Sequence, residues 1–105
     1  MERVNLSSSS SISRIIYGMW RLADDINTSS KHISDKVNLC LGQGITSFDQ
    51  AAVYGLYSAE ALFGEVLKAN PSLRHKIEIV SKCGIVNPSD RYPSVSVSHY
   101  DTSRE

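Results

Sequence analysis

The sequence predicts an α/β fold built on a parallel sheet. Three short runs rich in β-branched and aromatic residues alternate with two stretches that carry apolar residues at helical spacing. Such an alternation is typical of right-handed βαβ units, which place their strands parallel in one sheet. With 105 residues, of which 41% are hydrophobic and 21% charged, the chain has the size and composition of one globular domain.

The N-terminal segment is predicted to form a β-hairpin. Val4 to Leu6 can form a short strand, and the five serines at 7–11 can form the turn that follows it. Residues 12–22 then predict a strand, because β-branched and aromatic residues predominate there. Gly18, inside this strand, indicates a place where another group comes close to the backbone.

The next segment predicts a helix followed by a buried strand. Residues 28–30 are good N-cap residues, and Gly42 and Gly44 supply the end of the helix. Residues 45–48 then predict a short buried strand, with Asp49 at its C-terminal end. The apolar positions of the helix fall at i, i+4, i+7 and i+8, and they are Ile33, Val37, Cys40 and Leu41.

A second helix is predicted with Ser58 as its cap. It should end near Asn70, because Pro71 disfavours helical geometry in the residue before it. Its apolar stripe consists of Leu62, Phe63, Val66 and Leu67.

Residues 76–82 predict a third strand, residues 84–98 a loop rich in Pro, Ser and Asp, and residues 101–105 the beginning of a third helix. Three strands and two helices leave strand edges unpaired and apolar surface uncovered. We therefore expect residues 1–105 to form a single partial domain of a larger architecture, cut after about three βα units. We also expect that the chain can self-associate through its open strand edges.

Composition and charge argue against several classes of protein. Eleven basic and eleven acidic residues cancel, and no basic run is interleaved with aromatics, so nucleic acid is not an expected partner. The apolar run 15–20 lies between Arg14 and Arg21, far short of the roughly 20 residues that cross a bilayer. No apolar secretory signal is present at the start, and we expect a cytoplasmic protein without a membrane span.

The cysteines and histidines predict neither a disulfide nor a metal site. Cys40 and Cys83 fit free thiols in a reducing compartment. The three histidines lie apart from each other and from the cysteines, without the spacing that zinc ligands need.

Asp49, Tyr54 and Lys82 are the candidate chemical groups. In β/α architectures functional side chains gather at the C-terminal ends of the strands, where Asp49, Lys82 and also Trp20 are expected, with Tyr54 just after one of them. A free tyrosine has a pKa of about 10, and a neighbouring ammonium lowers it by favouring the phenolate. Lys82 can thus prepare Tyr54 for proton transfer while Asp49 holds the ammonium.

A purely structural alternative stands beside this hypothesis. Asp49 can cap the loop after its strand, Tyr54 can be a packed surface aromatic, and Lys82 can be a solvated charge. Ion pairs of this kind often have only a structural role.

Residues 14–85 resemble the N-terminal part of the aldo/keto reductase family. The segments that carry the resemblance are Gly18-Met-Trp-Arg21, the sequence GITSFDQAAVYG at 44–55, Glu60 followed by Phe-Gly-Glu at 63–65, and Ile-Val-Ser-Lys at 79–82. The sequence SKCGI at 81–85 is similar to the bacterial branch of general NADPH-dependent oxidoreductases.

The resemblance implies an NADPH-dependent enzyme that reduces small aldehydes or ketones to alcohols on a (β/α)8 TIM barrel. Residues 1–16 would form the hairpin that closes the bottom of the barrel. Tyr54 would be the general acid that protonates the carbonyl oxygen as hydride arrives, Lys82 would lower its pKa, and Asp49 would pair with Lys82. The residues expected to line the nicotinamide and substrate end of the pocket are Gly18, Met19, Trp20 and Arg21, with Asp49.

The resemblance also implies a fourth catalytic residue, a histidine after the next strand, which has no match in this sequence. His99 does not replace it, since it is expected in the loop before an opening helix. Most contacts to the cofactor phosphates would come from later strands, so we expect the 105-residue chain alone to be inactive. Two alternatives remain: a regulatory relative that binds nucleotide without turnover, and a truncated, inert gene product.

Overall fold

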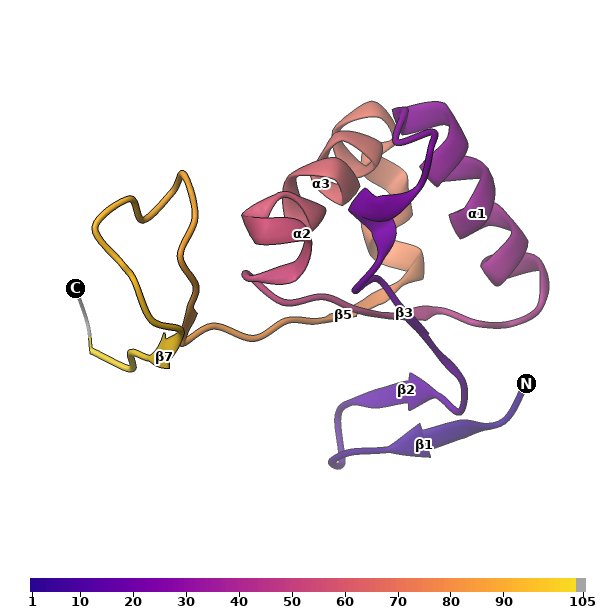
Figure 1. The fold of residues 1–105 in the computed structure, drawn as a ribbon. Coiled ribbons are helices and arrows are strands. Elements are labelled where there is room, and N and C mark those ends of the chain that lie inside the picture. Colours follow the sequence, from indigo (N-terminus) through magenta and orange to yellow (C-terminus); the bar gives the residue numbers. More distant parts are fainter. Residues whose placement is uncertain (104–105) are drawn as a thin grey trace.

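Residues 1–103 are described by the structure, a computed structural model. Its central sheet has three parallel strands in the order β3 (Ile16–Gly18), β4 (Ser47–Asp49) and β5 (Glu78–Val80). The helices α1 (Ser30–Gly42) and α3 (Ala59–Ala69) connect successive strands and lie together on one side of the sheet (Figure 1). The predicted α/β class is confirmed.

The register of the sheet separates a core face from an open face. Tyr17, Phe48 and Ile79 pair across the three strands, and Phe48 is fully buried against the helices. Because side chains alternate along a strand, the neighbouring positions point to the opposite face. That open face carries two levels of residues: Ile16, Ser47 and Glu78 near the N-terminal ends, and Gly18, Asp49 and Val80 at the C-terminal ends.

The first predicted helix is confirmed in position and in its buried face. The Ser29 hydroxyl accepts a hydrogen bond from the backbone N–H of His32 at 3.2 Å, which caps α1. Ile33, Val37 and Cys40 are buried, and the helix ends at Gly42 as expected.

The second predicted helix is also present, but its cap differs. α3 ends at Ala69, directly before Asn70 and Pro71. Ser58 does not cap it, because its hydroxyl donates to the carbonyl of Gly55 at 2.5 Å instead. A 3-10 helix, η2 (Pro71–Lys76), replaces the beginning of the predicted third strand, so that β5 starts at Glu78.

The predicted hairpin is confirmed, whereas the continuous strand over 12–22 is wrong. β1 (Arg3–Asn5) pairs antiparallel with β2 (Ser11–Ser13), and the chain then bends before it enters β3. A 3-10 helix, η1 (Leu22–Asp24), takes up the end of the range. Since β-branched residues populate both strands, their abundance could not reveal the bend. A Cβ at Gly18 would have no heavy atom within 4 Å among the described residues, so the expected close approach is not seen there.

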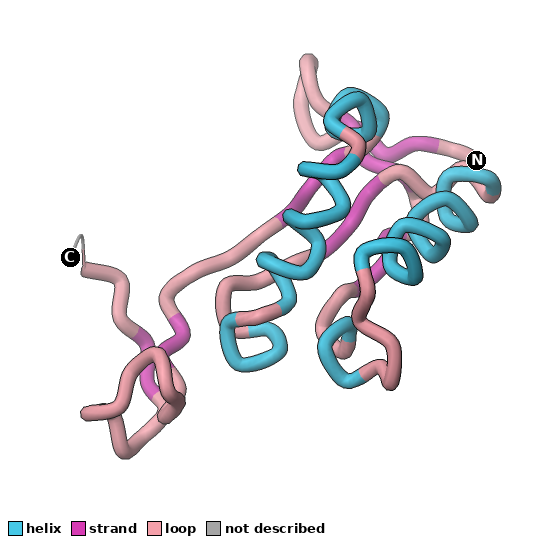
Figure 2. The backbone as a smooth tube through the Cα atoms, turned by 90° about the horizontal axis from the view of Figure 1, so that it is seen from above, coloured by secondary structure: helices cyan, strands magenta, loops and turns pink. Residues whose placement is uncertain are grey.

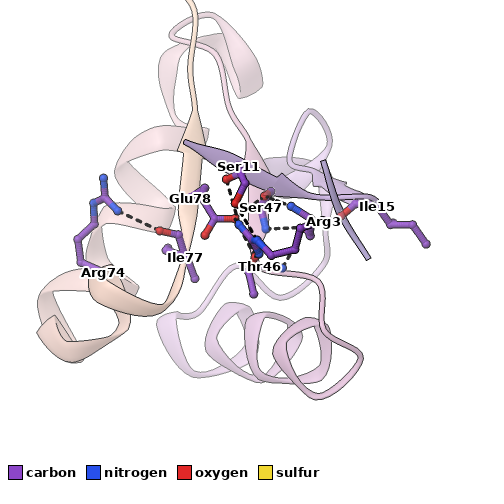
Figure 3. A network of polar contacts seen from close by, with 9 residues as sticks. Arg3, Ser11, Ile15, Thr46, Ser47, Arg74, Ile77 and Glu78 are labelled. Carbon is purple, nitrogen blue, oxygen red and sulfur yellow. Dashed lines mark hydrogen bonds and ion pairs between the residues drawn. The ribbon is translucent and has the colours of Figure 1, made fainter. Parts of the chain in front are cut away.

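The hairpin is fastened to the N-terminal ends of the sheet by a polar network (Figure 3). Arg3 donates to Glu78 at 2.7 Å, and the hydroxyls of Thr46 and Ser47 each donate to the same carboxylate oxygen at 2.8 Å. Ser13 and Ser47 exchange backbone-to-hydroxyl hydrogen bonds of 2.9 and 3.1 Å. The hairpin therefore lies at the end of the sheet opposite to Asp49.

The predicted loop 84–98 contains a small ladder instead of being wholly irregular. β6 (Ile85–Val86) pairs antiparallel with β7 (His99–Tyr100), so His99 lies in a strand and not in a loop. The predicted third helix has no counterpart at Asp101 and Thr102, and its last two residues, 104 and 105, lie outside the described residues. Figure 2 shows this C-terminal part extending away from the helices and the sheet.

Candidate active site

The site is set by how the chain continues past the strand ends. The backbone N–H of Gln50 donates to Val80 at 2.7 Å, and that of Ala52 donates to Lys82 at 2.9 Å. The two segments thus run side by side beyond β4 and β5, which places Lys82 across from Asp49. Strand pairing, and not the loops alone, fixes their relative position.

The structure brings together the three side chains that the sequence singled out. The Nζ of Lys82 donates to Oδ1 of Asp49 at 2.6 Å and to the carbonyl of Gln50 at 2.9 Å. The hydroxyl of Tyr54 donates to Oδ2 of Asp49 at 3.3 Å, and Nζ lies 5.1 Å from the centre of the Tyr54 ring. An ammonium, a phenol and a carboxylate therefore form one cluster, whose catalytic role stays a prediction.

The cluster favours the charged form of Lys82. The hydrogen bond to Asp49 raises the pKa of Lys82, partial desolvation acts against it, and Tyr54 adds a further favourable contact. About half of the Lys82 side chain is exposed, which leaves the ammonium reachable from solvent.

Tyr54 is presented by a short, unusual turn. α2 (Tyr54–Tyr57) contains left-handed backbone at Gly55, Leu56 and Tyr57, with φ of 63°, 50° and 72°. A Cβ at position 55 would lie 2.6 Å from the Ser58 hydroxyl and 2.7 Å from the Cβ of Ala23. Glycine is therefore required directly after Tyr54, both for its conformation and for space.

Residues 18–21, which are predicted to contact the cofactor, run beside this cluster and differ in how exposed their side chains are. The backbone N–H of Met19 donates to the carbonyl of Asp49 at 2.9 Å, while its side chain is 1% exposed in the core. Trp20 is 64% exposed, and the guanidinium of Arg21 lies 5.2 Å from the centre of the Trp20 ring. Among the described residues, Gly18 borders open space. Met19 can thus face a cofactor only through its backbone, and all four assignments stay predictions.

Three cavities lie around the cluster. The smallest, about 120 Å³, is lined by residues 51–54, Lys82, Cys83 and Ile85. A second cavity, of about 470 Å³, lies between Trp20 and the turn at Val53–Ser58. A third, of about 410 Å³, is lined by Tyr57 together with residues between positions 84 and 101. The two larger cavities include neither Tyr54 nor Lys82, so they flank the chemical groups.

Sequence reasoning missed two kinds of contributing residues. Gln50 is 1% exposed, donates to the sulfur of Met19 at 2.9 Å, and supplies the carbonyl that Lys82 binds. Tyr57 and Arg91 line the 410 Å³ cavity, where the guanidinium lies 5.8 Å from the ring centre of Tyr57. The available signal was the pair Arg91-Tyr92, a cation next to an aromatic ring in the loop predicted over 84–98.

Three further observations concern metal binding, the place of His99 and membrane spanning. Across residues 1–103, no three His, Cys, Asp or Glu side chains gather in a way that could hold a metal ion. His99 lies in β7 with its Nδ1 2.9 Å from the carbonyl of Val97, and the described contacts do not join it to the cluster. In the same part of the chain, the helices are too short and too polar for one of them to span a membrane.

Comparison with known proteins shows the family of the chain. Residues 14–105 match the sequence profile of the aldo/keto reductase family. A 6-dehydroglucose reductase of Agrobacterium fabrum is 56% identical over 103 residues, which are 98% of this chain and 35% of that protein. The Bacillus subtilis oxidoreductase YcsN is 42% identical over 99% of the chain and 34% of its own length.

A solved structure shows the same fold. It is that of a candidate aldo-keto reductase from Pseudomonas aeruginosa, which superposes with a TM-score of 0.73 at 24% identity, over 96% of this chain and 36% of that one. The architecture is thus the N-terminal part of a (β/α)8 barrel, as predicted. The chain belongs to the aldo/keto reductase family, and it spans about a third of the length of the curated relatives it matches.

Proposed function

We propose that this chain supplies the proton-transfer half of an NADPH-dependent carbonyl reductase. The observation that carries the proposal is the contact cluster in which Lys82 and Tyr54 bind opposite oxygens of Asp49 at the C-terminal end of β4. This is the end of the strands at which β/α barrels keep their active sites.

In the proposed reaction Tyr54 gives its phenolic proton to the carbonyl oxygen of the substrate. The ammonium of Lys82, 5.1 Å from the ring centre, stabilises the phenolate that remains. Asp49 holds that ammonium in place through the 2.6 Å contact and keeps the phenol oriented. NADPH, when bound, supplies the hydride.

The residues beside the cluster fit the flat ring of a nicotinamide. Gly18 leaves open space next to Asp49 on the open face of the sheet, and Trp20 offers an exposed aromatic ring. The choice of NADPH rests on the resemblance of the segment Ser81–Ile85 to general NADPH-dependent oxidoreductases.

For the substrate we propose a sugar aldehyde. The Agrobacterium fabrum relative, which is 56% identical over nearly the whole chain, is named a 6-dehydroglucose reductase. The free thiols Cys40 and Cys83 fit a reducing compartment, and we propose the cytoplasm as the place where the reaction occurs.

Replacement of the phenol tests the proposal directly. In the complete gene product, Tyr54→Phe should lower kcat for 6-dehydroglucose with NADPH by about 100-fold or more, because the proton donor is lost. The Kd for NADPH should stay unchanged, since the ring remains. Tyr100→Phe, on an 81% exposed tyrosine, is the matched control and should retain full turnover. Unchanged turnover in Tyr54→Phe would refute the assigned role.

A further inference from the structure

The 410 Å³ cavity has the size of a metabolite site and lies next to the proposed chemistry. Small-molecule sites commonly measure about 300–1,000 Å³. The C-terminal segment, here defined as residues 84–101, contributes part of the walls, including Arg91, Tyr92 and Asp101, but not the 81% exposed Tyr100. The other walls come from Ala52, Tyr57, Glu60 and Cys83. Figure 2 shows that the C-terminal segment extends away from the helices and the sheet.

The cavity is connected by its lining to the smaller one at Tyr54 and Lys82. Ala52, Cys83 and Ile85 contribute to both cavities. Cys83 follows Lys82 in the chain, and Tyr57 lies three residues after Tyr54. A substrate whose carbonyl is held at Tyr54 therefore has the larger cavity beside it for the rest of its atoms.

The walls combine flat aromatic surfaces with both donors and acceptors. The rings of Tyr57 and Tyr92 meet edge to face with centres 5.2 Å apart, and the guanidinium of Arg91 lies 5.8 Å from each centre. Glu60 and Asp101 add carboxylate acceptors to the same lining. Hydroxyl groups both donate and accept, so this mixture suits a ligand with several of them.

Charge and polarity argue against other ligands. The single arginine of the lining shares the cavity with the carboxylates of Glu60 and Asp101, so a phosphorylated or carboxylated ligand would meet repulsion as well as attraction. A purely apolar aldehyde would take these polar groups out of water without compensating hydrogen bonds. A neutral, polyhydroxylated molecule avoids the charge repulsion and can form hydrogen bonds with the polar groups of the lining.

We propose that this cavity binds the hydroxylated part of the sugar aldehyde, an inference that rests on the proposed function. Arg91 donates to the sugar hydroxyls. Tyr57 is a positioning residue, because its hydroxyl donates to the carbonyl of Ile85 at 3.2 Å and accepts from the backbone N–H of Asn87 at 2.8 Å. These two hydrogen bonds hold the C-terminal segment as a wall of the cavity.

Kinetics with two aldehydes tests the inference in the complete gene product. Arg91→Met should raise KM for 6-dehydroglucose about tenfold or more, the effect of losing hydrogen bonds from a charged donor, and should leave KM for butanal unchanged. Tyr57→Phe should raise KM for 6-dehydroglucose and leave kcat for butanal unchanged. Arg14→Met, on the exposed hairpin, and Tyr100→Phe are the matched controls.

A binding measurement separates this inference from the proposed function. Saturation-transfer NMR of methyl α-D-glucoside with the complete protein and NADP⁺ needs no turnover. Binding that is lost in Arg91→Met supports the sugar site even if neither aldehyde is reduced, in which case only the proposed function fails. The inference is overturned if the glucoside does not bind the wild type, or if Arg91→Met binds it equally well.

Discussion

The two oxygens of the Asp49 carboxylate have different partners: Oδ1 accepts from Lys82 at 2.6 Å, and Oδ2 accepts from Tyr54 at 3.3 Å. One residue at the end of β4 therefore fixes both an ammonium on the neighbouring segment and a phenol on the following turn. Among the three side chains, Asp49 is the one that forms a hydrogen bond with each of the other two.

Removal of this carboxylate charge should change the titration of Lys82. Its pKa is raised above the ordinary 10.5, first by the hydrogen bond to Asp49, so the pair stabilises the fold below pH 10.5 and loses this effect as the pH rises through the raised value. Asp49→Asn should lower the Lys82 pKa, as followed by NMR of the Nζ and Cε nuclei.

Tyr54→Phe is the matched comparison for that titration. Because Tyr54 contributes less than Asp49 to the raised pKa, its removal should lower the Lys82 pKa by a smaller amount. If Tyr54→Phe lowered the Lys82 pKa as much as Asp49→Asn or more, Asp49 would not be the main cause of the raised pKa.

At the scale of residues, the sequence predicted the cluster because strand ends are easy to locate from apolar runs. Asp49 and Lys82 each follow such a run, and parallel pairing brings them together. The carbonyl of Gln50 and the phenol of Tyr57 could not be predicted in the same way. Their roles depend on backbone direction and on a left-handed turn, which leave little trace in side-chain pattern.

At the scale of elements, the turn α2 determines where Tyr54 points, and Gly55 determines the turn. Gly55→Ala should destabilise the complete protein by about 1–2 kcal/mol from its positive φ, with an additional steric cost. Gly64→Ala, within α3, is a control of opposite sign. A Cβ at position 64 would have no heavy atom of a described residue within 4 Å outside the helix's own backbone, so the substitution should stabilise by about 0.5–1 kcal/mol. Urea unfolding midpoints measure both, and equal midpoints would exclude strain at position 55.

The contact between Arg3 of the hairpin and Glu78 of β5 is sensitive to acid. Burial acts to raise the pKa of Glu78, but hydrogen bonds from Arg3, Thr46 and Ser47 outweigh it and hold the pKa below its ordinary 4.5. The contact therefore stabilises the fold above pH 4.5, and the effect is lost as the pH falls through the lowered value.

Glu78→Gln should accordingly lower stability at pH 7 by about 1 kcal/mol, and the difference from wild type should shrink at pH 3. Urea midpoints at the two pH values provide the measurement. Glu2→Gln is the control, since the ion pair of Glu2 with Arg14 is exposed and should contribute almost nothing. A deficit that is the same at both pH values would show that the Glu78 charge is not responsible.

Elements were predictable where one periodicity dominated. α1 and α3 were found because their apolar positions repeat at helical spacing along each helix. The bend between β2 and β3 and the ladder of β6 with β7 were missed, since short strands are decided by distant partners rather than by local composition.

At the scale of the whole molecule, the outer edges of the sheet stay open. Within residues 1–103, no strand pairs with the free edge of β3 or of β5, and Ile16 on the open face is 40% exposed. Exposed edges of this kind template pairing with other chains.

We therefore propose that the 105-residue chain, produced alone, self-associates through these edges. Sedimentation velocity should show mass increasing with concentration, and Ile16→Lys should reduce the increase by placing a charge on the edge strand. Leu39→Lys, on the 71% exposed outer face of α1, is the control and should not change association. A monomer at every concentration would contradict the proposal.

The contact between Asp49 and Lys82 has a consequence for following how the chain folds. A carboxylate and an amine 2.6 Å apart, 33 positions apart in sequence, are suited to zero-length coupling by a water-soluble carbodiimide. The resulting isopeptide bond forms only when β4 and β5 have paired in the native register, because a slip of one residue turns the side chain to the other face. The yield of that covalent loop, read by mass spectrometry at successive times, would record when neighbouring strands find each other.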